Sequence, residues 1–249
     1  MKIKICGLTS PAEAEYLNRN HVDYAGMVLF FSKSRRNISL TRAKEIMAEL
    51  DPAIQKVAVL VSPTAEQVRE VAEAGFDILQ AHGEVSGDIF RAYEEVPEDI
   101  FQIHREITDD NFQTQGENSK SIFQTQGEKS GDIFQVSGEK SMKIQIWKAF
   151  NVKDMDRYEE YHANKYIHGY VFDAAVPGSG KTFDWNLVKS IPRDEKQFLL
   201  AGGLHPGNVK DAIRVLHPDG VDVSSGVERP EGGKDGRLVD EFVAAVREA

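Results

Sequence analysis

The sequence Val221-Asp222-Val223-Ser224-Ser225-Gly226-Val227-Glu228 has the same design as an earlier one, Phe198-Leu199-Leu200-Ala201-Gly202-Gly203-Leu204. Each is a short apolar run that ends in small residues, and such runs, separated by a helical pattern, are typical of buried parallel strands. Backbone N–H groups that follow two neighbouring strands can together bind an anion. A (β/α)8 barrel binds phosphate in this way after its seventh and eighth strands. We therefore predict a phosphate site built from the backbone N–H groups of Gly202, Gly203, Ser224, Ser225 and Gly226.

Strand and helix patterns alternate along the rest of the chain. The predicted strands are 2–6, 24–30, 56–61, 77–81, 144–150, 167–173, 198–201 and 220–223. Among the helices between them, one begins after Ser39 and another after Thr64, which forms a capping box with Gln67. Strict alternation implies a parallel sheet. Because the phosphate signal comes last rather than first, a closed barrel is favoured over an open doubly wound sheet. The prediction is one α/β domain, a (β/α)8 TIM barrel over residues 1–249.

A repeat interrupts this pattern between the fourth and fifth predicted strands. Phenylalanines recur every 11 residues, at Phe90, Phe101, Phe112, Phe123 and Phe134. The repeat contains few apolar residues, and burial of so little surface rarely offsets the entropy of ordering a chain. We predict that residues 98–141 form an insertion without chemistry, since surface loops tolerate added length. The alternative is an arm that binds a partner or forms an oligomer.

Composition limits the classes of function. The formal net charge is −10, which argues against nucleic-acid binding because that function needs a basic surface. The only cysteine is Cys6, so an intrachain disulfide and a cysteine-built zinc site are both excluded. No run of 18 apolar residues and no signal-like segment is found. We expect a cytoplasmic protein that does not enter a membrane.

Several polar or small residues follow the predicted strands, where active sites of this fold gather. The motifs, in chain order, are Lys4–Thr9, Ser34–Arg36, Gln80–Gly83, Phe172–Asp173, Pro177–Trp185, Leu200–Leu204 and Val221–Glu228. Together they make the sequence similar to the phosphoribosylanthranilate isomerases of tryptophan biosynthesis. The resemblance covers the chain in order, apart from the repeats. It implies an Amadori rearrangement of N-(5-phosphoribosyl)anthranilate, a small phosphorylated substrate, with no metal and no cofactor.

The resemblance also implies roles for single residues. Asp173 would be the general acid and Cys6 the general base, and the reaction does need an acid and a base on one sugar. A free thiol is only slightly ionised at neutral pH, so a positive field near Cys6 is expected. Burial is expected to raise the pKa of Asp173. Arg36 would bind the anthranilate carboxylate, since a guanidinium binds a carboxylate as a fork.

His82 and Asp222 are further candidates for substrate binding. His82 is either a group that supports the site or a hydrogen-bonded histidine at a strand end, and Asp222 is expected to orient the sugar or the loop beside it. The sequence Ala175–Thr182 imitates a nucleotide-binding P-loop but has alanine where the pattern needs the first glycine, and it lies late in the chain. We interpret it as a loop over the active site.

Two other functions stay open at this stage. One is a related barrel isomerase that acts on an aminoaldose phosphate of histidine biosynthesis, where two acidic residues usually do the work that Cys6 would share here. The other is a non-catalytic barrel whose repeat arm recruits a partner. The sequence does not decide between a monomer and a homodimer.

Overall fold

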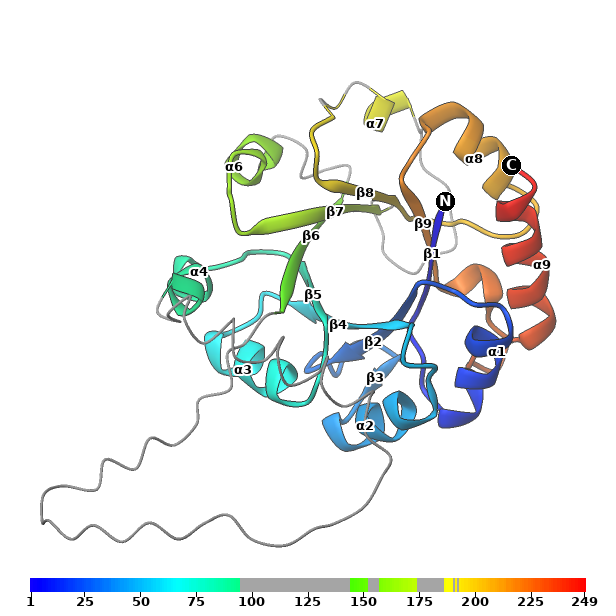
Figure 1. Cartoon of the computed structure of the whole chain (residues 1–249), viewed down its shortest axis with the longest axis horizontal. Coiled ribbons are helices and arrows are strands. Elements are labelled where there is room, and N and C mark those ends of the chain that lie inside the picture. Colours follow the sequence, from blue (N-terminus) through cyan, green and yellow to red (C-terminus); the bar gives the residue numbers. More distant parts are fainter. Residues whose placement is uncertain (95–143, 152–156, 174–185, 190, 192) are drawn as a thin grey trace, which may run out of the picture.

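The chain folds into a closed ring of parallel strands surrounded by helices (Figure 1), as a computed structural model shows. The structure describes residues 1–94, 144–151, 157–173, 186–189, 191 and 193–249. The strands are β1 (Lys2–Cys6), β2 (Tyr24–Leu29), β3 (Asn37–Ile38), β4 (Gln55–Val61), β5 (Ile78–His82), β6 (Gln145–Asn151), β7 (Ile167–Asp173), β8 (Gln197–Leu200) and β9 (Gly220–Val223). Their order is β1-β9-β8-β7-β6-β5-β4-β2-β3, and a further pairing of β1 with β2 closes the ring.

The predicted TIM barrel is therefore confirmed. All eight predicted strands are present, with bounds that differ by at most one residue at either end. The short strand β3 was not predicted, because two residues are too few to show a hydrophobic pattern. It pairs in parallel with the end of β2 and adds nothing to the ring.

The helices cover the outside of the ring. They are η1 (Pro11–Glu13), α1 (Ala14–Arg19), α2 (Leu40–Glu49), α3 (Ala65–Glu73), α4 (Gly87–Glu94), α6 (Tyr158–His162), α7 (Asn186–Lys189), α8 (Val209–Leu216), η4 (Ser225–Val227) and α9 (Gly236–Arg247). The predicted caps are present: the hydroxyl of Ser39 accepts from the N–H of Arg42, and Thr64 forms its capping box with Gln67. These caps satisfy N–H groups that have no partner inside the helix.

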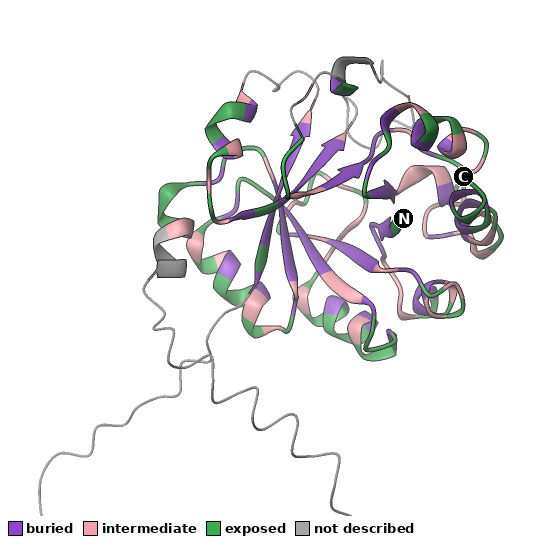
Figure 2. Cartoon of the chain, turned by 45° about the horizontal axis from the view of Figure 1, so that its top comes forward, coloured by how far each residue is buried: buried purple, intermediate pink, exposed green. Residues whose placement is uncertain are grey.

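Apolar side chains fill two separate regions. The strands of the ring are buried along most of their length, whereas the helices are exposed on their outer side (Figure 2). The larger core lies between the strands and the helices. The smaller one lies inside the ring and includes Cys6, Trp147, Val171 and Leu199. Alternate residues of a strand point to opposite faces, so each strand sends one set of side chains into the ring and the other set toward the helices.

The same alternation explains which polar side chains enter the ring. Cys6 and Val171 belong to the inner cluster. Lys4 stands two residues before Cys6, and Asp173 stands two residues after Val171, so both are on the inward face. Because the strands are parallel, their carboxyl ends meet at one end of the barrel. This geometry brings Cys6 and Asp173 to the same rim of the ring.

Some predictions concern residues that the structure does not describe. Most of the repeat, including the predicted insertion 98–141, lies outside the described residues, as do Ala175–Thr182 and the rest of the loop that follows β7. Of the helices that are described, none is long and apolar enough to cross a membrane.

Candidate active site

Cys6 ends β1 with its side chain inside the ring, where it is 9% exposed. The inward side chain two residues earlier, Lys4, is fully buried, and its Nζ lies 2.9 Å from Oδ2 of Asp222 on β9. Gly26 of β2 leaves room for both, because a Cβ at Gly26 would lie 2.9 Å from Sγ of Cys6 and 3.0 Å from Nζ of Lys4. The predicted base is thus in contact with a buried ion pair.

Buried charges act on the Cys6 thiol in opposite directions. Burial raises the pKa of Cys6 above the ordinary 9.0, Lys4 and Lys234 lower it, and Asp222 raises it further. The net direction is upward, so the thiol form predominates at neutral pH. Burial also lowers the pKa of Lys4, but Asp222 and Cys6 raise it by more, and Lys4 therefore keeps its charge. The expected positive field is present, although it does not outweigh burial.

This balance makes the reactivity of Cys6 a direct test of the two neighbours. Lys4→Met is expected to lower the rate of Cys6 alkylation at neutral pH by about tenfold or more, because an opposite charge within a few ångströms favours the thiolate. Asp222→Asn is expected to raise that rate, since Asp222 opposes ionisation. Iodoacetamide labelling as a function of pH measures both effects, and Cys6 is the only cysteine that can react.

Unfolding in urea provides the control, because all variants should then be alkylated at one rate. Lys4→Met also leaves Asp222 buried without its partner, so a loss of about 3–5 kcal/mol of stability is expected. Circular dichroism must show that the variant is folded at the labelling temperature. Equal alkylation rates in the folded wild type and both folded variants would contradict this account of the thiol.

Asp173 ends β7, which is separated from β1 in the ring by β8 and β9. It is paired in register with Asn151 at the end of β6, and it is half-buried. Burial lowers the pKa of Arg36, but neighbouring acidic groups raise it by more, and Cys6 and Asp173 are among them. These two groups are therefore near the guanidinium. The structure thereby brings together the predicted acid, the predicted base and the predicted carboxylate ligand.

Arg36 lies in the loop after β2, and its stem passes over Gly7. A Cβ at Gly7 would lie 2.5 Å from Cδ of Arg36, and Gly7 has a φ of +81°, a conformation that only glycine adopts at little cost. Arg36 is 14% exposed, whereas its neighbour Arg35 is 58% exposed. This difference supports the choice of Arg36 over Arg35 as the carboxylate ligand.

A carboxylate that the sequence did not predict already contacts Arg36. Glu228, after η4, accepts from Nε of Arg36 at 2.6 Å and from Nη2 at 2.9 Å. Nζ of the fully buried Lys234 donates to the same carboxylate at 2.9 Å. Burial works against the charge of Glu228, but hydrogen bonds and attraction from Arg36 and Lys234 lower its pKa to about 2. Glu228 is therefore ionised at any pH at which the protein works.

The two loops predicted to bind phosphate lie against each other. Gly202 and Gly203 follow β8 with φ values of +88° and +67°, and Asn208 holds the carbonyl of Gly203 through a 3.0 Å hydrogen bond. After β9, Ser224 precedes the single turn η4, whose first N–H groups have no partner within the turn. A Cβ at Gly226 would lie 1.9 Å from the carbonyl oxygen of Leu204. The predicted pairing of these loops is present, and their contact with phosphate stays a prediction.

His82 ends β5, and its Nε2 lies 3.1 Å from Nε2 of Gln80. Burial lowers the pKa of His82 to about 4, and the positive charges of Lys148 and Lys4 add to this effect. His82 is therefore neutral at pH 7, and it can offer a hydrogen bond but no charge.

No function was predicted from the sequence for three residues of the site: Lys4, Glu228 and Lys234. The position of Lys4 in the sequence could have indicated its place in the site, because it is two residues from Cys6 on a predicted strand and so lies on the same face. Glu228 and Lys234 gave no such indication, since their contacts join residues up to 221 positions apart. In the described part of the chain, no cluster of three or more histidine, cysteine, aspartate or glutamate residues could hold a metal ion.

Comparison with known proteins gives a consistent result. A family profile described as N-(5'-phosphoribosyl)anthranilate (PRA) isomerase matches residues 115–245. The N-(5'-phosphoribosyl)anthranilate isomerase of Acetivibrio thermocellus is 32% identical, with 99% of this chain and 96% of the relative covered. That of Aquifex aeolicus is 31% identical, with 98% and 97% covered.

Solved structures agree with the sequence comparisons. One, described as monomers generated from the dimeric phosphoribosylanthranilate isomerase of Thermotoga maritima, has a TM-score of 0.67 and 28% identity, and both chains are covered completely. Another is a phosphoribosylanthranilate isomerase in complex with reduced 1-(o-carboxyphenylamino)-1-deoxyribulose 5-phosphate, with a TM-score of 0.65, 27% identity and complete coverage of both chains. With its closed barrel and the shared rim of Cys6, Arg36 and Asp173, the chain belongs to the N-(5'-phosphoribosyl)anthranilate isomerase family.

Proposed function

We propose that this protein converts N-(5-phosphoribosyl)anthranilate into 1-(2-carboxyphenylamino)-1-deoxyribulose 5-phosphate in tryptophan biosynthesis. The observation that carries the proposal is the meeting of a thiol, a carboxyl group and a guanidinium at one rim of the barrel. Cys6 and Asp173 are on inward faces of β1 and β7, and both interact with the charge of Arg36. Two glycine- and serine-rich loops stand beside them.

The reaction is an isomerisation, so every proton that the protein gives must be balanced by one that leaves. The carboxyl group of Asp173 protonates the ring oxygen of the ribose, the bond from that oxygen to C1 breaks, and the anthranilate nitrogen forms a double bond to C1. The thiolate of Cys6 then removes the proton from C2, which yields an enol. Loss of the hydroxyl proton at C2 and gain of a proton at C1 give the ketone. General acid–base steps of this kind contribute about 10²- to 10⁴-fold each.

The remaining candidates hold the two ends and the middle of the substrate. Arg36 binds the anthranilate carboxylate, and the N–H groups of Gly202, Gly203, Ser224, Ser225 and Gly226 bind the phosphate. Asp222 orients the sugar. Its Oδ2 contacts Lys4, whereas its buried Oδ1 has no hydrogen-bond partner among the described residues. A buried oxygen of this kind is costly unless it accepts a hydrogen bond, and a sugar hydroxyl can supply one. His82 supports the site as a neutral group.

The direct test is turnover. Purified protein is incubated with N-(5-phosphoribosyl)anthranilate, and the loss of substrate fluorescence is followed, with Cys6→Ser as the matched inactive variant. We expect rapid loss with the wild type only. A well-folded wild type without turnover would remove the proposal. A panel that includes the aminoaldose phosphate of histidine biosynthesis separates the two isomerase activities.

We further infer that the protein works as a monomer or a homodimer. The relative from Thermotoga maritima is described as dimeric. Light scattering on a sizing column decides which state this chain adopts, and an assembly larger than a dimer would contradict the inference.

A further inference from the structure

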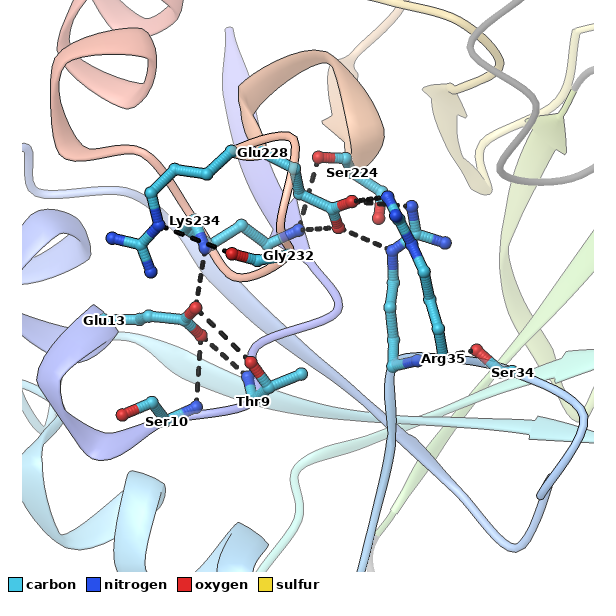
Figure 3. A network of polar contacts seen from close by, with 11 residues as sticks. Thr9, Ser10, Glu13, Ser34, Arg35, Ser224, Glu228, Gly232 and Lys234 are labelled. Carbon is cyan, nitrogen blue, oxygen red and sulfur yellow. Dashed lines mark hydrogen bonds and ion pairs between the residues drawn. The ribbon is translucent and has the colours of Figure 1, made fainter.

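Glu228 stands at the centre of a polar network that joins three loops at the rim of the barrel (Figure 3). Its carboxylate accepts four hydrogen bonds, from Nη2 of Arg35, from Nε and Nη2 of Arg36 and from Nζ of Lys234. The side chain is only 4% exposed. Two of the cations are also well buried, so the contacts persist with little screening by water.

Lys234 is itself fixed from several sides. Its Nζ also lies 3.2 Å from the carbonyl oxygen of Ser224, in the predicted phosphate loop. Its backbone N–H donates to Glu13 at 2.6 Å. The other oxygen of Glu13 accepts from the N–H groups of Thr9 and Ser10, in the loop that follows Cys6. Through Lys234, Glu228 is thus connected to the loop that follows Cys6 and to the predicted phosphate loop.

The contacts of Arg36 determine which of its N–H groups remain for a ligand. A guanidinium has five N–H donors and two edges that can grip a carboxylate. Glu228 occupies the edge formed by Nε and Nη2. Among the described residues, Nη1 of Arg36 has no hydrogen-bond partner. The edge formed by Nη1 and Nη2 is therefore the one that a second carboxylate can use.

We propose that Glu228, held by Lys234, is a positioning residue that fixes the Arg36 fork so that the substrate carboxylate binds along the Nη1–Nη2 edge. The inference rests on the proposed function and adds the residue that sets its selectivity for a carboxylated aromatic ring. Three cations surround the single carboxylate of Glu228, so the cluster keeps two positive charges for an anionic ligand. Glu228 does not itself touch the substrate.

The test uses two stable ligands that differ only in the carboxylate. One is the reduced product, 1-(2-carboxyphenylamino)-1-deoxypentitol 5-phosphate, and the other is its phenylamino counterpart. Titration calorimetry measures their affinities for the wild type and for Glu228→Gln, which keeps the shape of the side chain and removes its charge. We expect Glu228→Gln to bind the carboxylated ligand about 10- to 100-fold more weakly, as for a lost charged hydrogen bond, and to bind the phenylamino ligand unchanged.

Glu231→Gln is the matched control, because Glu231 lies in the same loop, is 72% exposed and forms an ion pair with the exposed Arg229 rather than with Arg36. It should keep the wild-type preference for the carboxylate. Glu228→Asp, which keeps the charge on a shorter stem, should fall between Glu228→Gln and the wild type, and it replaces Glu228→Gln if that variant does not fold. In turnover, the Glu228 variants should raise KM far more than they lower kcat.

Three results would overturn the proposal. Tighter binding of the carboxylated ligand by Glu228→Gln would mean that Glu228 competes with the substrate. An unchanged preference would mean that Arg36 needs no positioning. An equal loss for both ligands would mean that Glu228 supports the phosphate loop instead. Failure of the wild type to bind the carboxylated ligand would instead count against the proposed function, so the two failures can be told apart.

Discussion

Cys6→Ser and Asp173→Asn are each expected to lower kcat for N-(5-phosphoribosyl)anthranilate by about a hundredfold or more, with KM changed by less than about threefold. A serine hydroxyl ionises far less readily than a thiol, so Cys6→Ser cannot remove the proton from C2. An asparagine amide has no acidic proton, so Asp173→Asn cannot protonate the ring oxygen. Neither change alters the Arg36 fork or the phosphate loops, and binding should survive.

Steady-state kinetics with matched concentrations of folded protein measure both variants. Asp211→Asn, on the exposed side of α8, is the control for a lost aspartate, and it should behave as the wild type. The stable reduced product should bind both variants with nearly the wild-type affinity. Retention of kcat by either variant would show that the roles of acid and base are wrongly assigned.

Gly226→Ala is expected to raise KM by about tenfold or more and to weaken inhibition by inorganic phosphate to a similar degree. The added Cβ would lie 1.9 Å from the carbonyl oxygen of Leu204 and 2.9 Å from Cβ of His205. The first of these is a backbone atom, so the loops after β8 and β9 must move apart. Forced packing of this kind costs about 1–3 kcal/mol, and the displaced N–H groups no longer converge on one phosphate.

Gly87→Ala is the matched control for this substitution. A Cβ at Gly87 meets nothing within 4 Å, so that variant should keep the wild-type KM and phosphate inhibition. Inhibition constants for inorganic phosphate, measured for both variants, separate a damaged phosphate site from a general loss of activity. An unchanged KM and inhibition constant in Gly226→Ala would show that the two loops do not bind the phosphate together.

Local pattern was enough to predict the barrel. Buried parallel strands require apolar runs, and the strands β1, β7 and β9 begin and end where those runs do. Ser39 and Thr64 act as caps through hydrogen bonds to residues three positions away, which a sequence displays directly. The closed ring followed from the alternation of elements and from the place of the phosphate motif.

The site was predicted less completely because its electrostatics depend on distant pairs. The spacing of Lys4 and Cys6 shows that they share a strand face, but the partner of Lys4, Asp222, is 218 positions away. Glu228 ends a quoted motif, but nothing near it in the sequence indicates that Arg36 and Lys234 surround it. The expected positive field near Cys6 is present, but the sequence did not show that burial would raise the pKa of the thiol by more than the two lysines lower it.

The ring closes where β1 joins both β2 and β9. The strand that carries Cys6 is synthesised long before its neighbour in the ring, the strand from Gly220 to Val223. A nascent chain that stops before β9 contains Cys6 but lacks the strand that pairs with β1 on that side and holds Cys6 in place. We therefore expect catalytic competence to arise only after β9 has been synthesised and has paired with β1.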